Sequence, residues 1–354
     1  MRNKRSLTAA PLPPLLRHDL QGVVWPMWSS CRLASPKLAL VFAAAILAAG
    51  NQAPAQKPAA IRQVRNAAEQ KNWAEARRIL DAFEKDNGRT SAWLEAYSWI
   101  ARGRLFAEEY GEAVRVARDV EQQALALLKT RKLGGDASLA IALGAAIEVQ
   151  GLALDAQGQK SEAVAYLQQQ LKRYYSSPIR ARIQKNLHLV SLEGRAAPAL
   201  AVAESVGPNK PVPLSSLRGR KVLMFFWAHW CGDCKGMAAT MARISKEFPN
   251  LAIVGPTQPY GYIAGGEEAP RPREVAYIEE TRAKYYGAIE RMSVPVSEEN
   301  FKLWGASTTP TLAVIDKTGI VRLYHPGSMT YDELVPYLRD EQPAKPSSSK
   351  TSGR

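Results

Sequence analysis

Two cysteines separated by two residues, Cys231 and Cys234, constrain this chain more than any other feature. The apolar run over residues 222–227 precedes them and is typical of a buried strand. Apolar residues then recur at the spacing of a helix face, at Met237, Met241, Ile244 and Phe248. The pair is therefore predicted at a helix N-terminus, where free N–H groups and the helix dipole favour a thiolate. Because it comes first, Cys231 is the predicted exposed nucleophile, and Cys234 is placed to resolve a mixed disulfide.

The first 55 residues have the order of a secretory signal peptide. Basic residues precede a twelve-residue apolar run at 38–49, and Ala-Pro-Ala follows at 53–55. The run is shorter than the ~20 residues that a transmembrane helix needs. We therefore expect cleavage before Gln56 and export, with a periplasmic location. The alternative is an uncleaved signal that anchors the chain. Because the leader is long, Met27 is an alternative start to Met1.

Cysteine usage then favours chemistry over a structural role. The third cysteine, Cys31, would leave with the leader, so the only disulfide open to the mature chain joins Cys231 and Cys234. A loop closed across two residues adds little folding stability. A closed zinc site needs four ligands, and no second ligand motif accompanies these cysteines and His229. Neither a metal nor a cofactor is expected.

Residues 56–195 are predicted to be helical. They are rich in Ala, Leu, Glu, Gln and Arg, and no proline occurs from 59 to 177. A short signature recurs at 73–76 (Trp-Ala-Glu-Ala), 110–113 (Tyr-Gly-Glu-Ala) and 160–163 (Lys-Ser-Glu-Ala). Near the third copy, Gly151 and Gly158 are small residues of the kind that let two helices approach closely, with Leu167 beyond them. The pattern resembles the tetratricopeptide repeat, whose period is ~34 residues, although the spacings here are longer.

That resemblance implies a helical solenoid, whose concave surface usually binds protein. The alternative is a plain helical bundle that packs on the rest of the chain or dimerises. The aromatic residues of this region are predicted to belong to the core: Trp93, Tyr97, Trp99 and Phe106. His188 is predicted to be an ordinary helix residue.

The motif Trp-Ala-x-Trp-Cys-x-x-Cys on a strand-to-helix turn resembles the thioredoxin superfamily. More narrowly, it is similar to the exported TlpA/ResA-type thiol-disulfide oxidoreductases, over residues 197–340. A second feature is Pro310 directly before an apolar strand, which is an unusual place for proline. In this superfamily a cis-proline at that place lies against the cysteine pair, and the residue before it bonds an extended substrate. The resemblance therefore implies a cis bond between Thr309 and Pro310 and a substrate groove shaped by both residues.

The elements expected of that fold follow in order along residues 196–341. Apolar runs predict strands at 200–203, 222–227, 251–254, 294–296, 311–315 and 320–324. Helices are predicted after the cysteines and at 274–291, 298–305 and 330–339. A Gly/Pro/Tyr-rich insertion at 257–273 is long for a connection, and such loops are often functional. The expected architecture is an α/β thioredoxin-like fold at 196–341, an all-α helical-repeat domain at 56–195, a leader at 1–55 and a disordered tail at 342–354.

Several positions depart from the thioredoxin pattern. Asp233 replaces a proline between the cysteines, and its charge predicts a higher pKa for Cys231 and a more reducing couple than proline would give. His229 would stabilise a thiolate if it were protonated, although its position favours a simple exposed loop histidine. Phe225 replaces the buried acid that shuttles protons in thioredoxin.

Candidates to replace that acid are Glu267, Glu268 or solvent. Trp227 and Trp230 are predicted to pack around the cysteine pair. The candidate substrate-binding residues are Trp230, Thr309 and Pro310.

Together these features predict an exported enzyme that reduces protein disulfides, with electrons supplied by another dithiol protein. The helical region would recruit a protein partner or client. The formal net charge is +14, but no Lys/Arg run with interleaved aromatics indicates a nucleic-acid partner. Membrane contact is expected only through an uncleaved leader.

Two alternatives differ in class. A peroxiredoxin-like peroxidase shares the fold, but Cys231 lacks the Pro-x-x-x-Thr/Ser-x-x-Cys context of that family. The other alternative is a helical-repeat adaptor whose thioredoxin-like part is a redox sensor or has lost activity.

Overall fold

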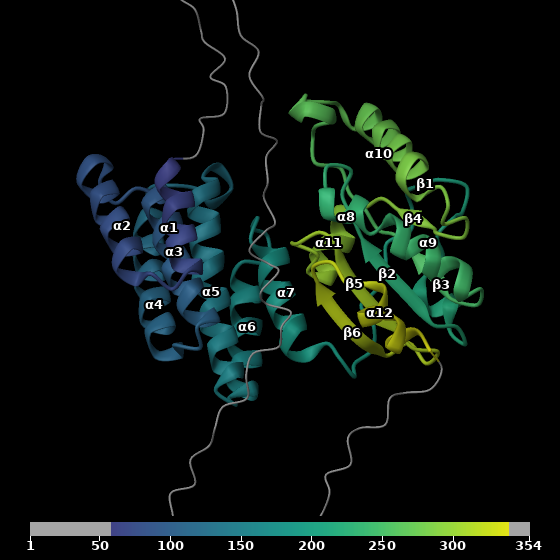
Figure 1. Ribbon diagram of the computed structural model, residues 1–354, viewed down its shortest axis with the longest axis horizontal. Coiled ribbons are helices and arrows are strands. Elements are labelled where there is room, and N and C mark those ends of the chain that lie inside the picture. Colours follow the sequence, from purple (N-terminus) through teal and green to yellow (C-terminus); the bar gives the residue numbers. More distant parts are fainter. Residues whose placement is uncertain (1–57, 340–354) are drawn as a thin grey trace, which may run out of the picture.

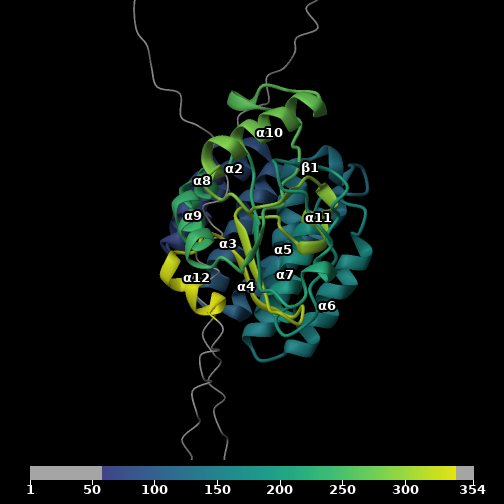
Figure 2. The same ribbon diagram turned by 90° about the vertical axis from the view of Figure 1, so that its right-hand side faces the viewer.

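A computed structural model describes residues 58–339. The predicted signal peptide, the choice between Met1 and Met27 and the predicted tail lie outside these residues. Figure 1 shows a helical part beside an α/β part, with α7 between them; Figure 2 gives the perpendicular view.

The helical part contains seven helices within the described residues. They are α1 (Ala59–Glu69), α2 (Trp73–Asn87), α3 (Ser91–Phe106), α4 (Tyr110–Leu127), α5 (Ala137–Ala156), α6 (Lys160–Arg173) and α7 (Arg180–Ser191). The three recurring signatures begin α2, α4 and α6, and the alanine that ends each signature is fully buried. Helices α1 and α2, α3 and α4, and α5 and α6 pack as pairs, while α1, α3, α5 and α7 pack successively on one another. The signature therefore marks a small buried residue in the first turn of every second helix.

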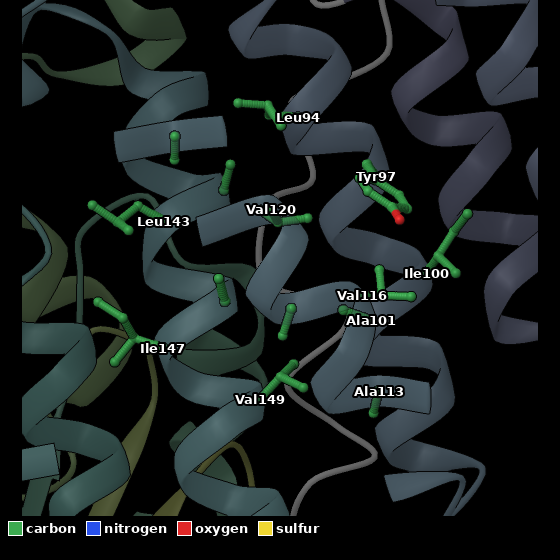
Figure 3. Packing of buried hydrophobic residues seen from close by; sticks show 14 of the residues in the cluster. Leu94, Tyr97, Ile100, Ala101, Ala113, Val116, Val120, Leu143, Ile147 and Val149 are labelled. Carbon is green, nitrogen blue, oxygen red and sulfur yellow. The ribbon is translucent and has the colours of Figure 1, made fainter. Parts of the chain in front are cut away.

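The core of this part is an apolar layer shared by α3, α4 and α5 (Figure 3). Trp93 and Tyr97 are buried in the core as predicted, whereas Trp99 and Phe106 are half-buried at its edge. Within residues 58–339 only α5 is long and apolar enough to span a membrane by composition, but 72% of that window is buried. Helix α5 is thus the central core helix of this part.

Glycines permit two close helix contacts. An added Cβ at Gly151 would lie 2.7 Å from the side chain of Leu167, which confirms the predicted approach of α5 and α6. The same prediction was wrong for Gly158, where an added Cβ would meet nothing within 4 Å. Gly158 instead follows α5 with φ +80°, a conformation that glycine adopts without a steric penalty.

The α/β part is built on two sheets. The larger has the order β3 (Ala252–Val254), β2 (Val222–Phe226), β5 (Thr311–Ile315) and β6 (Val321–Pro326). Strand β3 is parallel to β2, whereas β2–β5 and β5–β6 are antiparallel. The smaller sheet pairs β1 (Ser205–Val206) with β4 (Val294–Pro295). The helices are α8 (Gly232–Gly236), α9 (Ala238–Glu247), α10 (Arg271–Tyr286), α11 (Glu298–Trp304) and α12 (Tyr331–Leu338).

Strand β2 is central, and both of its faces are buried. Leu223 and Phe225 face a core formed with α9, α10 and α12. Met224 and Phe226 face a second core that contains Phe301 and other side chains of α11. Because both faces are covered, every residue of the strand is apolar. This continuous apolar run is what allowed the strand to be predicted from the sequence.

The predicted strand at 200–203 is wrong, since this segment is irregular. At Ala201 the backbone bonds to a side chain instead of to a neighbouring strand. The amide of Asn300 donates to the Ala201 carbonyl and its oxygen accepts from the Ala201 N–H, at 2.9 and 2.7 Å. The strand that pairs with β4 begins later, at Ser205.

Helix α7 joins the two parts by packing on α11 and β6. The buried guanidinium of Arg180 forms an ion pair with Glu299 at 2.8 Å. His188 was predicted to be an ordinary helix residue, but its Nε2 lies 2.9 Å from the Leu303 carbonyl at this junction. Gly305 has φ +62°, and an added Cβ would clash with the backbone of Lys185. The junction is therefore a close, specific contact between the two parts.

Candidate active site

The two cysteines lie where β2 gives way to α8. Cys231 is the N-cap of α8, and the Cys234 N–H points at the Cys231 Sγ from 3.1 Å. The sulfurs are joined in a disulfide, with the Cα atoms 5.3 Å apart. The exposed fraction is 3% for Cys231 and 0% for Cys234. Both cysteines are therefore buried in this disulfide form, which corrects the prediction of an exposed Cys231, although Cys231 is the more accessible of the two.

The segment before β5 lies against the cysteines. The bond between Thr309 and Pro310 is cis, as the resemblance implied. The Thr309 carbonyl oxygen lies 3.4 Å from the Cys231 Sγ. The Pro310 carbonyl is occupied within the chain, because it accepts a hydrogen bond from the Gly327 N–H at 2.8 Å. Residues almost eighty positions apart thus meet at one sulfur atom.

The two tryptophans before the cysteines have different surroundings. Trp227 is fully buried and donates its indole N–H to the Gly255 carbonyl at 2.9 Å. Trp230 is 42% exposed and packs edge to face against Tyr260 at 5.5 Å between ring centroids. Trp227 belongs to the same buried core as the two cysteines, whereas Trp230 presents an aromatic surface beside Cys231.

His229 corrects the prediction of an exposed loop histidine. It is 1% exposed, and its Nε2 lies 3.0 Å from the Glu274 carboxylate. Burial lowers the pKa of His229 below its ordinary value, while the hydrogen bond and charge of Glu274 act in the opposite direction. The insertion at 257–273 folds back over the imidazole and removes it from water.

Glu274 is a buried acid that the sequence analysis missed. It is fully buried in the first turn of α10 and is hydrogen-bonded to His229 and to two backbone N–H groups of the insertion. A signal existed, because Glu274 precedes the buried Ile278 by four residues, which is the spacing of one helix face. The candidates named from sequence, Glu267 and Glu268, are exposed instead, and Glu267 pairs with Arg273.

Phe225 is fully buried and packs edge to face on Tyr286 at 5.6 Å between ring centroids. Asp233 is exposed in the first turn of α8. Among residues 58–339, no three His, Cys, Asp or Glu side chains come together as a candidate metal site.

Comparison with known proteins identifies the domain. The thioredoxin-like domain family matches residues 215–342. The C-terminal domain is thioredoxin-like. The match begins before β2 and includes both cysteines and the segment around Pro310, so the family covers the whole candidate site.

Relatives of the thioredoxin-like domain include thiol-disulfide oxidoreductases. The thioredoxin-like protein YneN of Bacillus subtilis is 24% identical over 143 residues, which is 40% of this chain and 76% of that protein. The thiol-disulfide oxidoreductase ResA of Bacillus thuringiensis is 27% identical over 152 residues, 42% of this chain and 79% of that protein. A solved structure, the exposed lipoprotein thioredoxin Etrx1 of Streptococcus pneumoniae, is 25% identical, covers 41% of this chain and 98% of its own, and has a TM-score of 0.31.

Proposed function

We propose that this protein is an exported thiol-disulfide oxidoreductase that reduces protein disulfides through Cys231 and Cys234. The observation that carries the proposal is the closed disulfide between them at the end of β2, with the Thr309 carbonyl against the first sulfur. The homology of the domain to thiol-disulfide oxidoreductases supports the same reaction class.

The reaction begins with the reduced pair. The Cys231 thiolate attacks one sulfur of a client disulfide, forms a mixed disulfide and releases the other client sulfur as a thiolate, which takes up a proton. The Cys234 N–H, 3.1 Å from the Cys231 Sγ, is placed to donate a hydrogen bond to the attacking thiolate. Such a bond favours the charged form of the nucleophile.

The second step closes the disulfide seen in the structure. The Cys234 thiolate attacks the Cys231 Sγ, and the client leaves with its second sulfur as a thiolate. Two electrons have then passed to the client, and the protein holds the disulfide. Return to the dithiol state requires two electrons from another dithiol protein, by the same exchange in reverse.

The rest of the molecule suggests how a client is recruited. We propose that the helix pairs α1–α6 form a tetratricopeptide-like surface for a protein partner, since the three signatures begin equivalent helices. Export to the periplasm, by a cleaved signal or with the signal kept as an anchor, belongs to the same proposal and rests on the leader sequence.

Single cysteine variants test the reaction. We expect Cys231→Ser to lower insulin reduction by about 10³-fold or more, because the nucleophile is lost. Cys234→Ser should also lose turnover, but it should trap a mixed disulfide that is visible on a non-reducing gel. In the uncleaved chain, which keeps the leader, Cys31→Ser is the matched control and should keep full activity; the predicted mature chain has no cysteine besides the pair.

Two results would refute this assignment. One is a trapped adduct in Cys231→Ser instead of Cys234→Ser, which would reverse the two roles. The other is rapid peroxide consumption without insulin reduction, which would favour a peroxidase.

A further inference from the structure

The insertion at 257–273 forms part of the surroundings of the cysteine pair. It follows β3, its last three residues form the start of α10, and Thr257 at its beginning is bridged to Val296 beside the smaller sheet. Tyr260 of the insertion packs edge to face against Trp230. Because Trp230 directly precedes Cys231, the insertion lies next to the side from which a client would approach.

One carboxylate holds this insertion in place. Glu274 accepts hydrogen bonds from the Tyr260 N–H, from the Gly261 N–H at 2.8 Å and from the His229 ring at 3.0 Å. The donors come from two segments about thirty residues apart, one of which leads into Cys231. A fully buried carboxylate is stable only when such donors surround it, and its removal would leave the N–H groups of Tyr260 and Gly261 without their acceptor.

The histidine completes the contact. An ionised carboxylate can only accept hydrogen bonds, so the proton of His229 is assigned to Nε2, 3.0 Å from Glu274. The imidazole is packed edge to face by three rings, with centroid distances between 5.4 and 5.7 Å, from Tyr260, Tyr262 and Tyr277. Two of these rings belong to the insertion and the third to α10. The His229 imidazole therefore fills the space between the segment that leads into Cys231 and the insertion.

We propose that Glu274 and His229 are positioning residues that fix the 257–273 insertion as a wall of the client site beside Cys231. The wall places Tyr260 against the exposed Trp230 and gives a polypeptide client an aromatic surface next to the reacting sulfur. We expect a small disulfide to reach the sulfur without using this wall. The inference rests on the proposed function, because it assigns a role in the choice of client.

Amide hydrogen exchange and disulfide-reduction kinetics test the inference on the full chain. In Glu274→Ala we expect the amide protection of Tyr260 and Gly261 to fall by at least about 10-fold, because their acceptor is lost. The ratio of the rate constants for insulin and for the small disulfide 5,5′-dithiobis(2-nitrobenzoate) should fall at least fivefold, while the small disulfide reacts within twofold of wild type. Glu274→Gln keeps one acceptor oxygen and should restore most of both losses.

A matched control and a second variant keep the outcome interpretable. Glu280→Ala removes an exposed carboxylate from the same helix and should change neither measurement. Tyr260→Ala leaves the buried carboxylate intact and should lower the rate ratio in the same direction. Unchanged amide protection in Glu274→Ala, or an unchanged ratio in both Glu274→Ala and Tyr260→Ala, would overturn the inference. Wild-type protein that reduces neither disulfide would instead refute the proposed function.

Discussion

At the scale of single residues, Asp233 is the one acidic side chain between the two cysteines. It is exposed in the first turn of α8, two residues after Cys231. Its charge disfavours a thiolate on either sulfur, but solvent screens an exposed charge strongly. We therefore expect Asp233 to raise the pKa of the Cys231 thiol only modestly.

Asp233→Asn isolates this charge without the backbone change that proline would bring. We expect the thiolate pKa of Cys231 to fall by about half a unit, as for a screened charge at close range. Titration of the thiolate absorbance of the reduced proteins measures the change, and the couple should become less reducing. An equal or higher pKa in the variant would show that Asp233 does not tune the nucleophile.

At the scale of elements, the helical part depends on close helix contacts at glycine. Gly103 lies in the last turn of α3 against α1. An added Cβ there would lie 2.9 Å from the Ala68 carbonyl oxygen and 3.1 Å from the ring of Trp73. Since a backbone atom cannot swing aside as a side-chain end can, the two helices would have to separate.

We expect Gly103→Ala to lower the free energy of unfolding by about 1–2 kcal/mol, because the overpacking cost exceeds the gain in helix propensity. Gly111→Ala is the control, since an added Cβ in α4 meets nothing within 4 Å. That variant should be neutral or stabilised by about 0.5 kcal/mol. Urea unfolding of both proteins decides the point, and equal stabilities would contradict the close contact.

At the scale of the whole molecule, α7 determines how the helical part sits on the thioredoxin-like domain. His188 packs edge to face on Tyr324 of β6 at 5.4 Å between ring centroids. Its Nε2 donates a hydrogen bond to the Leu303 carbonyl. Burial lowers the pKa of His188 from 6.5 to about 4, against the opposing hydrogen bond to Leu303. The junction therefore holds a neutral histidine at pH 7.

This pKa makes the junction acid-sensitive. Between about pH 6.5 and 4 the unfolded chain binds a proton at His188 that the folded chain does not, so stability present above pH 6.5 is lost as the pH falls. We expect wild type to lose on the order of 3 kcal/mol more than His188→Gln over this interval. Urea midpoints at pH 7, 5 and 4 measure the difference, and parallel pH profiles would contradict it.

Most elements of the thioredoxin-like domain were predictable from local pattern. The run at β2 is apolar throughout because both faces are buried, and β5 and β6 flank a turn at 317–319. The false strand at 200–203 shows the limit of this reasoning. Its apolar residues are consistent with a strand, but the Ala201 backbone bonds to the Asn300 side chain, nearly a hundred positions away.

The candidate site was predicted less completely. Both cysteines and Pro310 carry their signal in the sequence, since their residue types at those spacings are rare without a chemical reason. For Glu274 the sequence carries only the helix-face spacing to Ile278, and for His229 it carries none; neither shows that an insertion closes over these two side chains. The surroundings of a titratable side chain depend on which distant segments cover it.

The sequence by itself determined the redox pair, the strand and helix on either side of it, and the close approach of two helices at Gly151. These depend on local periodicity and on side-chain size and chemistry, which are properties of the chain. Only the tertiary structure decided that Glu274 joins His229 to the insertion, that Trp230 is exposed while Trp227 is buried, and that His188 lies at a junction. Burial and hydrogen-bond partners across long separations arise when the chain packs, so no local pattern encodes them.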